Sequence, residues 1–420
     1  MNNRMKHGLH TYVACLLVLA LQASAQVTDW APTNWPSSPY VQDIAIDAAG
    51  RVFALTYVDG VYRTTDDGDN WMNLAFPDTY VSCIATNNSG HVFIGTWGHG
   101  LYRSTNNGST WAKSGLQTSR INRIAINTEG KIFVGLDGEG GDSTLYRSTD
   151  NGNTWTLCIN GISFPQLITA ITTGASGSVY ASAVASSGGV FHSTDDGDSW
   201  TPTSLTGAPI SLLITQAGHV FAGVNGAYKS TDNGKSWAPV DSGCPTDLVR
   251  SLIANATGYI FRGMQSYGAS GGVCVSIDDG EHWYERTSGL PTRVIQALAM
   301  NSAGFIFAAT FGSGVFRSSH SMTSVSGSET PIPKDVQLYQ NYPNPFNPST
   351  TISFIIPSRS FVSLKIFDLL GKEMATIVSG ELPAGSYSEE WDASTMSSGM
   401  YLYRLQAGSF TETKKLVLLR

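Results

Sequence analysis

The stretch Ser193-Thr194-Asp195-Asp196-Gly197-Asp198-Ser199-Trp200 decides the fold, because near copies of it recur along the chain. The other copies run from Thr64 to Trp71, Ser104 to Trp111, Ser148 to Trp155, Ser230 to Trp237 and Ser276 to Trp283. Their glycines are Gly68, Gly108, Gly152, Gly197, Gly234 and Gly280, at spacings of 40, 44, 45, 37 and 46 residues. Repeats of about 40–50 residues with four strands each are typical of propeller blades.

A second phrase, a glycine between two apolar runs, occurs seven times. Its glycines are Gly50, Gly90, Gly130, Gly177, Gly218, Gly258 and Gly304. A turn glycine between β-branched and aromatic runs predicts a hairpin. We therefore predict an all-β chain in which residues 26–320 form a seven-bladed β-propeller.

The last blade lacks its own outer strand in sequence order. It ends near Phe316-Arg317-Ser318-Ser319 without a copy of the first phrase. Asp29-Trp30-Ala31-Pro32 precedes the first inner strand in the way that Asn70-Trp71 precedes the second. We expect this N-terminal strand to complete the last blade beside Val315–Ser318, which closes the ring and removes an exposed sheet edge.

Residues 27–320 resemble the Asp-box, or BNR-repeat, propeller superfamily. That superfamily includes sialidases, xyloglucan-degrading enzymes, sortilin-type receptors and photosystem II assembly factors, so the resemblance implies an architecture and says little about function. In each phrase the Asp can cap the N–H groups of its own turn, the Gly supplies a positive φ, and the Trp packs beneath the hairpin.

We expect the Asp-box side chains to be structural. They are Asp66, Asp150, Asp195, Asp232 and Asp278 together with Trp71, Trp111, Trp155, Trp200, Trp237 and Trp283. A cation site at Asp195-Asp196-Gly197-Asp198 is the alternative, but Asn106 replaces the Asp in the second copy, so a charge is not obligatory there. No metal and no cofactor are expected.

The first 25 residues have the pattern of a signal peptide. Arg4 and Lys6 precede the apolar run Tyr12–Leu21, and Ala23-Ser24-Ala25 suits cleavage after Ala25. Ten apolar residues are too few to span a bilayer. Export to the periplasm permits disulfides. Cys244 and Cys274 could pair, or the four remaining cysteines, which include Cys83 and Cys158, are single buried residues.

After a Ser-, Thr- and Pro-rich linker over 321–335, residues 336–420 contain short alternating strands. These are Ile352–Ile356, Val362–Phe367, Tyr387–Trp391 and Gly399–Leu405. Turn residues between short strands predict a small Ig-like β-sandwich.

Four motifs in this region resemble the type A sorting domain of the type IX secretion system. They are Asn341-Tyr342-Pro343-Asn344-Pro345-Phe346-Asn347-Pro348, Asp368-Leu369-Leu370-Gly371-Lys372, Gly399-Met400-Tyr401 and the basic-apolar terminus Lys414–Arg420. The resemblance implies the secretion machinery as a partner, export across the outer membrane, and removal of the domain on release or surface attachment. The alternative is an ordinary adhesive sandwich module.

The composition excludes some partners. The net charge is −7 and no basic cluster occurs, which disfavours nucleic acid. Beyond the signal peptide, no stretch is long and apolar enough to cross a membrane.

Candidate binding residues lie on one face of the predicted propeller. Strand alternation places the Asp-boxes and tight Gly turns on one face, and the other loops on the opposite, upper face. Aromatic and acidic side chains there could stack on and hydrogen-bond a sugar or a peptide. These residues are Tyr57, Asp59, Trp97, His99, Asp137, Glu139, Asp142, Tyr267 and Phe311. The alternative is that they are solvated loop residues without a ligand.

No catalytic constellation is recognisable. Tyr284 and Glu285 are adjacent on a predicted outer strand, so they face opposite ways. Arg63, Arg103, Arg147 and Arg317 recur at one blade position, which indicates repeat architecture rather than a carboxylate-binding cluster. A single propeller also cannot form the cleft between two propellers that the xyloglucan enzymes use. We predict a secreted or surface-anchored, non-enzymatic propeller for recognition or scaffolding. The alternative is a carbohydrate-active hydrolase, sialidase- or xyloglucanase-like, with acids on the upper face.

Overall fold

The computed structural model describes residues 29–37, 40–78, 80–117, 119–137, 145–162, 167–184, 188–266, 268, 270–322, 336–341, 343–356, 360–382 and 385–419. Strands but no α-helix occur in these ranges, so the all-β prediction is confirmed. Contacts divide the chain into two units, Met1–Ser324 and Val325–Arg420. The predicted signal peptide and nearly all of the predicted linker lie outside the described residues.

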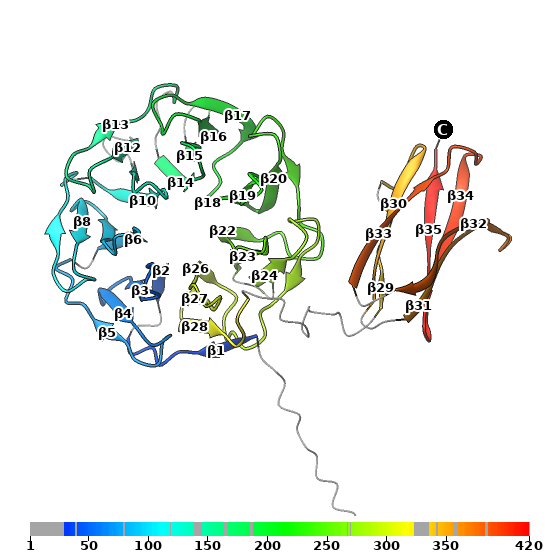
Figure 1. Ribbon diagram of the computed structural model, residues 1–420, viewed down its shortest axis with the longest axis horizontal. Helices are drawn as coiled ribbons and strands as arrows, with labels where there is room; N and C mark the ends of the chain where they lie inside the picture. The colour runs from blue at the N-terminus through cyan, green and yellow to red at the C-terminus, as the bar shows by residue number, and fades with distance from the viewer. Residues whose placement is uncertain are drawn as a thin grey trace, which may run out of the picture. The chain divides into compact units, whose positions relative to one another are not determined.

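The first unit is a ring of four-stranded antiparallel sheets around a central axis (Figure 1). Sheet 1 holds β2 (Val41–Ile46), β3 (Val52–Thr56), β4 (Val61–Thr64) and β5 (Met72–Asn73). Sheet 2 holds β6 (Val81–Thr86), β7 (Val92–Thr96), β8 (Leu101–Ser104) and β9 (Ala112–Lys113). Sheet 3 holds β10 (Ile121–Ile126), β11 (Ile132–Leu136), β12 (Leu145–Ser148) and β13 (Thr156–Leu157).

The ring continues in the same pattern. Sheet 4 holds β14 (Leu167–Thr173), β15 (Val179–Val184), β16 (Gly189–Ser193) and β17 (Thr201–Thr206). Sheet 5 holds β18 (Ser211–Ile214), β19 (Val220–Val224), β20 (Gly226–Ser230) and β21 (Ala238–Pro239). Sheet 6 holds β22 (Leu248–Ala254), β23 (Ile260–Gln265), β24 (Gly272–Ser276) and β25 (Tyr284–Glu285). Sheet 7 holds β26 (Ile295–Met300), β27 (Ile306–Thr310), β28 (Gly314–Ser318) and β1 (Trp30–Pro32).

The second strand of each sheet supplies the core between sheets. Strands β3, β7, β11 and β27 are buried along their whole length, as strands covered on both faces must be. The aromatic residue three positions after each turn glycine is at most 1% exposed. Phe53, for example, packs with Ile84 and Ile94 of the next sheet. Burying one such side chain stabilises the fold by about 1.5–3 kcal/mol.

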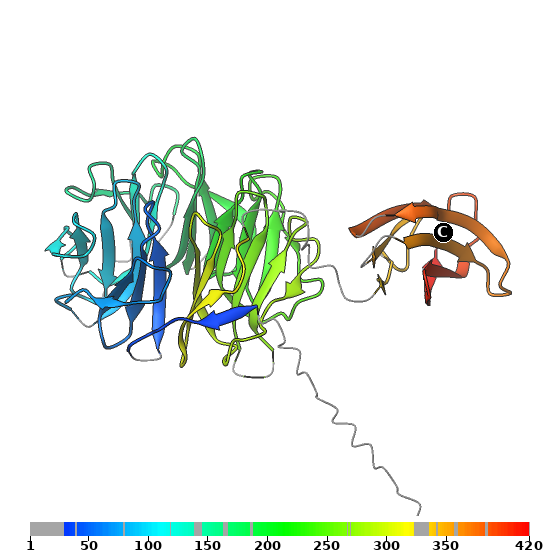
Figure 2. The same cartoon turned by 60° about the horizontal axis from the view of Figure 1, so that its bottom comes forward.

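The N-terminal strand β1 is the outer strand of sheet 7 and lies beside β28 in both views (Figures 1 and 2). Trp30 pairs with Ser318 and Pro32 pairs with Phe316. The Trp30 side chain is 3% exposed, and its Nε1–H donates to the Arg286 carbonyl of sheet 6 at 2.6 Å. The start of the described chain is therefore bound to the end of the ring.

The four described cysteines differ in state. Cys244 and Cys274 form a disulfide, one of the two possibilities that the sequence left open. Beside it the buried Arg262 pairs with Asp241 at 2.6 Å and lies over the Trp283 ring at 4.5 Å. Cys83 and Cys158 are free and buried. Burial raises the pKa of the Cys83 thiol to about 12 and that of Cys158 to about 11, so both stay protonated and unreactive.

The second unit consists of two sheets with a shared core. One sheet holds β29 (Gln337–Leu338), β30 (Ser349–Ile356) and β33 (Gly385–Asp392). The other holds β32 (Glu373–Leu382), β31 (Ser360–Phe367), β34 (Gly399–Ala407) and β35 (Phe410–Leu418). Their inward residues, among them Phe354, Leu364 and Tyr403, are fully buried. The sequence did not predict β32, and the basic-apolar terminus lies largely in β35, which pairs with β34.

Candidate functional site at the upper rim of the propeller

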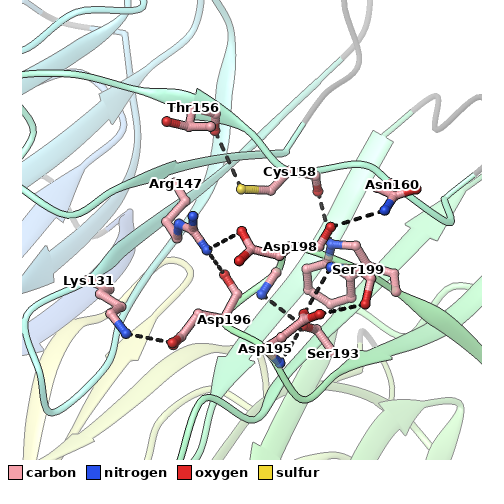
Figure 3. Close-up of polar contacts among 12 residues, drawn as sticks. Lys131, Arg147, Thr156, Cys158, Asn160, Ser193, Asp195, Asp196, Asp198 and Ser199 are labelled. Carbon is pink, nitrogen blue, oxygen red and sulfur yellow. Dashed lines mark hydrogen bonds and ion pairs between the residues drawn. The ribbon is translucent and has the colours of Figure 1, made fainter.

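The six Asp-box turns and the tight glycine turns form what we call the lower rim. Asp195 shows the geometry of the box (Figure 3). Its Oδ1 accepts from the Ser193 hydroxyl at 2.7 Å and from the Ser199 N–H at 2.9 Å. Its Oδ2 accepts from the Ser199 hydroxyl at 2.6 Å. The Ser193 hydroxyl in turn accepts from the Gly197 N–H at 2.8 Å. Both carboxylate oxygens of Asp195 thus accept hydrogen bonds from residues of its own turn.

The same bonds set the charge state of the boxes. They hold the pKa of Asp66, Asp150, Asp195 and Asp232 at about 2, below the ordinary 3.8. In the second copy, Asn106 Oδ1 accepts from the Ser104 hydroxyl and the Thr110 N–H, both at 2.9 Å. An amide therefore makes the same two acceptor contacts. Among the described residues, no group of three or more His, Cys, Asp or Glu side chains is arranged to hold a metal ion.

The residue before each box glycine links neighbouring sheets. It has φ between 55° and 60° in all six boxes, a conformation that Asp and Asn tolerate better than most residues. In four of the six boxes its carbonyl accepts from an arginine on the third strand of the preceding sheet. The pairs are Arg63 with Asn107, Arg103 with Asn151, Arg147 with Asp196, and Arg317 with Asp67. The recurring arginines are thus inter-sheet links.

The box tryptophans lie just before the outer strands and pack under their own turns. A Cβ on Gly197 would meet the Trp200 ring at 3.3 Å. Trp200 is 4% exposed, packs with Phe133 of the preceding sheet, and donates from Nε1 to the Cys158 carbonyl at 3.0 Å. Trp283 is 1% exposed, whereas the other four are half-buried.

We define the upper rim as the residues that follow each second strand and those that precede each inner strand. Buried threonines hold its loops. Thr56, Thr96 and Thr310 each donate to the glycine carbonyl four residues later, at 2.7–3.0 Å. The sheet therefore fixes the position of the next residue, which is Tyr57, Trp97 or Phe311.

Aromatic side chains occupy one sector of the upper rim. Tyr57 N–H donates to the Tyr40 carbonyl at 3.2 Å, and Trp97 N–H donates to the Tyr80 carbonyl at 2.8 Å. Tyr40 also bridges to Phe311, with ring centroids 4.7 Å apart. We call Phe311, Tyr40, Tyr57, Tyr80 and Trp97 the aromatic arc. Four of these side chains are 43–64% exposed, a large apolar surface to leave in water.

A cavity of about 480 Å³ lies at one end of the aromatic arc. It is lined by Tyr57, Tyr80, Trp97, His99, Arg120, Gln42 and Val81. The structure thus brings together three of the predicted residues: Tyr57, Trp97 and His99. A second cavity, of about 400 Å³, includes Tyr40, Phe311, Thr292 and Arg293 in its lining.

His99 is held in place by its loop and by a carboxylate. Its Nδ1 lies 2.6 Å from Oδ2 of Asp78, whose side chain is only 6% exposed. The loop needs glycine at position 100, because a Cβ there would lie 2.2 Å from the Leu116 carbonyl oxygen. A carboxylate can only accept, so Nδ1 carries the proton and Nε2 of the neutral ring is an acceptor.

Gln42 reaches the cavity because β2 has a bulge. The β2–β3 register shifts between Val41 and Asp43, which leaves Gln42 unpaired in the ladder. Next to it, the Asp43 carboxylate accepts from the N–H groups of Ile44 and Ile84, both at 2.9 Å, and so links sheets 1 and 2. Burial raises the pKa of Asp43 to about 6 despite these bonds.

None of the other predicted residues that the structure describes lines the first cavity. Asp59 accepts from the Ser37 hydroxyl at 2.9 Å, and Asp137 donates its N–H to the Arg120 carbonyl at 2.9 Å. Phe311 lines the second cavity. Glu139, Asp142 and Tyr267 lie outside the described residues.

Sequence reasoning missed Tyr40, Tyr80, Arg120 and Gln42. The first three directly precede inner strands and are 40 residues apart, the spacing that also separates Tyr57, Trp97 and Asp137. That periodicity could have identified them. The position of the Gln42 side chain depends on the bulge in β2, which no residue type in the sequence predicts.

Two family models match parts of the chain. Residues 340–419 match the secretion system C-terminal sorting domain, and residues 112–259 match the DUF6242 beta propeller domain. No curated protein matches at a significant level. In the part of the chain that the structure describes, no helix has the length and apolarity to span a bilayer.

Solved structures with similar folds have different roles. PorZ, a surface component of the type IX secretion system of Porphyromonas gingivalis, is 16% identical with a TM-score of 0.51 over 93% of this chain and 61% of PorZ. YCF48 from Cyanidioschyzon merolae is 14% identical with a TM-score of 0.54, over 69% of this chain and 97% of YCF48. The GH74 enzyme of Niastella koreensis is 14% identical with a TM-score of 0.54, over 94% of this chain and 75% of the enzyme.

At these identities the likeness shows the fold alone, because one fold supports enzymes and non-enzymes. This chain also spans only 61% of PorZ. The sorting-domain match implies export to the cell surface or release from the cell. The chain therefore carries a β-propeller domain followed by a type IX secretion system C-terminal sorting domain.

Proposed function

We propose that the chain is a non-enzymatic propeller, secreted or held at the cell surface, that recognises a ligand through the cavity between Tyr57 and Arg120. The observation that carries this proposal is the convergence of three exposed or half-exposed aromatic side chains, a fixed histidine and an arginine in one cavity. A concave site with apolar walls and a few placed polar groups is the usual form of a binding site.

We assign four segments to the chain, of which the second contains the repeats. Residues 1–25 are a signal peptide that directs export to the periplasm, 26–320 a seven-bladed Asp-box propeller closed by its N-terminal strand, 321–335 a linker, and 336–420 an Ig-like sorting domain. The seven sheets and the β1–β28 pairing support the propeller assignment. The Asp195-type hydrogen-bond network supports the Asp-box assignment.

The cavity favours recognition over hydrolysis. A glycosidase needs two carboxyl groups within about 5–9.5 Å of each other at the substrate. Among the described residues that line the cavity, none is Asp or Glu. Asp78 is not among the described lining residues, but its carboxylate holds two of them: it lies 2.6 Å from His99 Nδ1 and accepts from the Tyr80 N–H at 3.1 Å. Glu285, the one acid of the Tyr284-Glu285 pair, is ion-paired with Arg293 away from this cavity.

One experiment tests the export assignment. A chain without residues 336–420 should keep a folded propeller, because the two units have separate cores, but should stay inside the cell envelope. Cell fractionation and immunoblotting follow its location. Truncated protein in the medium or on the surface would contradict the assignment.

A second experiment tests recognition. A chain of residues 26–420, which retains the sorting domain, is screened on arrays of glycans and of peptides. Each ligand found is retested with Trp97→Ala and with the exposed sorting-domain control Phe361→Ala. Ligand binding should be lost only in Trp97→Ala. Turnover of a bound glycan that Asp59→Asn or Asp137→Asn abolishes would support the hydrolase instead.

A further inference from the structure

We propose that the cavity between Tyr57 and Arg120 holds an uncharged pyranose ring, and that the glycan carrying this ring extends along the aromatic arc toward Phe311. This inference rests on the proposed recognition function and specifies its ligand. It is argued from three features: the hydrogen-bonding capacity of the cavity, its aromatic walls, and the second cavity farther along the rim.

The cavity presents acceptors as well as donors. In the neutral ring His99 Nε2 is an acceptor, since Nδ1 then donates to Asp78. Gln42 Nε2 donates to the Ser82 carbonyl at 3.3 Å, so the other atom of this side-chain amide is the acceptor oxygen Oε1. That Oε1 is buried and has no hydrogen-bond partner among the described residues. A buried acceptor without a donor is energetically unfavourable, because it has lost its hydrogen bonds to water.

A ligand that supplies donors removes this cost. The bond from Gln42 to Ser82 is long, so the amide can tilt toward the cavity when a donor arrives. Arg120, also in the lining, offers N–H donors. A hydroxyl both donates and accepts, so neighbouring hydroxyls of one sugar ring can satisfy Gln42, His99 and Arg120 together. A carboxylate would suit Arg120 and oppose the two acceptors.

The aromatic walls suit the flat face of a sugar. Tyr57 is 64% and Tyr80 is 62% exposed, so both present broad ring surface to solvent rather than an enclosed apolar pocket. The face of an aromatic ring carries negative potential, which attracts the weakly positive C–H groups on one face of a pyranose. An aliphatic or aromatic peptide side chain would instead need enclosure to gain from burial.

The second cavity indicates that the ligand is extended. It is lined by Tyr40 and Phe311, and the Tyr57 N–H bond to the Tyr40 carbonyl makes those two residues neighbours on the rim. The two cavities therefore lie at either end of one aromatic surface. Its polar lining consists of Ser266, Thr292 and Arg293; the two hydroxyl side chains suit sugar hydroxyl groups, and the Arg293 guanidinium is already ion-paired with Glu285. One sugar ring cannot reach both cavities, whereas a linear oligosaccharide can.

The test uses a chain of residues 26–420, which retains the sorting domain, and neutral hexasaccharides of glucose, mannose and xylose, with a galacturonate hexamer as the charged probe. Trp97 lies in the cavity, so tryptophan fluorescence and calorimetry report binding. At least one neutral hexamer should bind, and the charged hexamer more weakly. Trp97→Ala, Tyr57→Ala and Gln42→Leu should each weaken binding about tenfold or more, which corresponds to about 1.4 kcal/mol.

Two comparisons sharpen the result. Phe311→Ala should weaken the hexasaccharide and leave the matching disaccharide unchanged, because only the longer ligand reaches the second cavity. Phe361→Ala, which alters a 56% exposed aromatic of the sorting domain, should change neither. Equal losses for both ligands in Phe311→Ala would refute the extended placement.

The outcomes separate this inference from the proposed function. If no neutral oligosaccharide binds, but a peptide binds and loses affinity in Tyr57→Ala and Trp97→Ala, the sugar assignment is wrong and recognition stands. The same holds if only the charged hexamer binds through these residues. If no ligand of any class depends on Tyr57, Trp97 or Gln42, both are wrong.

Discussion

The two rims of the propeller use the same strands in opposite ways. On the lower rim, Asp195 and its counterparts have nearly identical partners, and their oxygens are saturated by their own turns. On the upper rim, a buried threonine fixes the loop in three sheets, but the residue that follows it is Tyr57 in one sheet, Trp97 in the next and Phe311 in another. Repetition marks the residues that build the ring, and variation at a repeated position marks those available for a ligand.

Two tryptophans test this division most strongly. Trp200→Ala should destabilise the propeller by about 3–5 kcal/mol, because it empties a site packed against Phe133. Trp97→Ala removes a half-exposed ring and should change stability by no more than about 0.5–1 kcal/mol. Urea unfolding of both variants checks this. A large loss of stability in Trp97→Ala would mean that the upper rim also builds the ring.

The arginine links between sheets should have the next largest effect. Arg147→Ala removes a donor 2.6 Å from the Asp196 carbonyl and an ion pair with Asp198, and should cost about 1.5–3 kcal/mol. Arg147→Lys should cost less, since Lys229 at the equivalent position of sheet 5 pairs with Asp279. Thermal unfolding compares the two variants. Ligand binding should be unaffected, and a loss of binding would mean that the rims are coupled.

The box carboxylates should matter less. Asp195→Ala should cost about 1–2 kcal/mol, the range for loss of a comparable side-chain cap. Asp195→Asn should be nearly neutral, because Asn106 makes the same acceptor contacts in the second copy. Unfolding with and without calcium separates the two roles. A calcium-dependent rise in stability that Asp195→Asn abolishes would show that the boxes bind ions.

Protonation of the box carboxylates at low pH should have the smallest effect on stability per residue. The pKa values of Asp66, Asp150, Asp195 and Asp232 are lowered in the fold to about 2 from the ordinary 3.8. Their stabilising contribution is therefore complete above about pH 4 and is lost as the pH falls through 2. Each contribution is small because these groups are exposed to solvent. Unfolding midpoints between pH 5 and 2 should fall less steeply in Asp195→Asn, and an equal slope would contradict this assignment.

The repeats predicted most of the ring but only part of the candidate site. Turn glycines and box residues recur in the sequence, so the hairpins that join the first two strands of each sheet were predicted. Trp97 and His99 were found because they follow a repeated strand. Tyr80 and Arg120 were missed because their loops carry no motif, and Gln42 because its exposure depends on a bulge. Which carboxylates stay outside the cavity depends on loop conformation, which sequence pattern does not encode.

The way the chain enters and leaves the ring has a mechanical consequence. The Ser319 N–H donates to the Asp29 carbonyl at one end of the antiparallel β1–β28 pair. A force that pulls these two residues apart would therefore break the hydrogen bonds of the pair one after another, starting from that end. A pull on the sorting domain does not reach this pair first. It meets Met322, whose N–H is bound to Gly304 and whose carbonyl is bound to Asn255. A force applied to the chain beyond residue 322 therefore loads these two hydrogen bonds before it loads the β1–β28 pair.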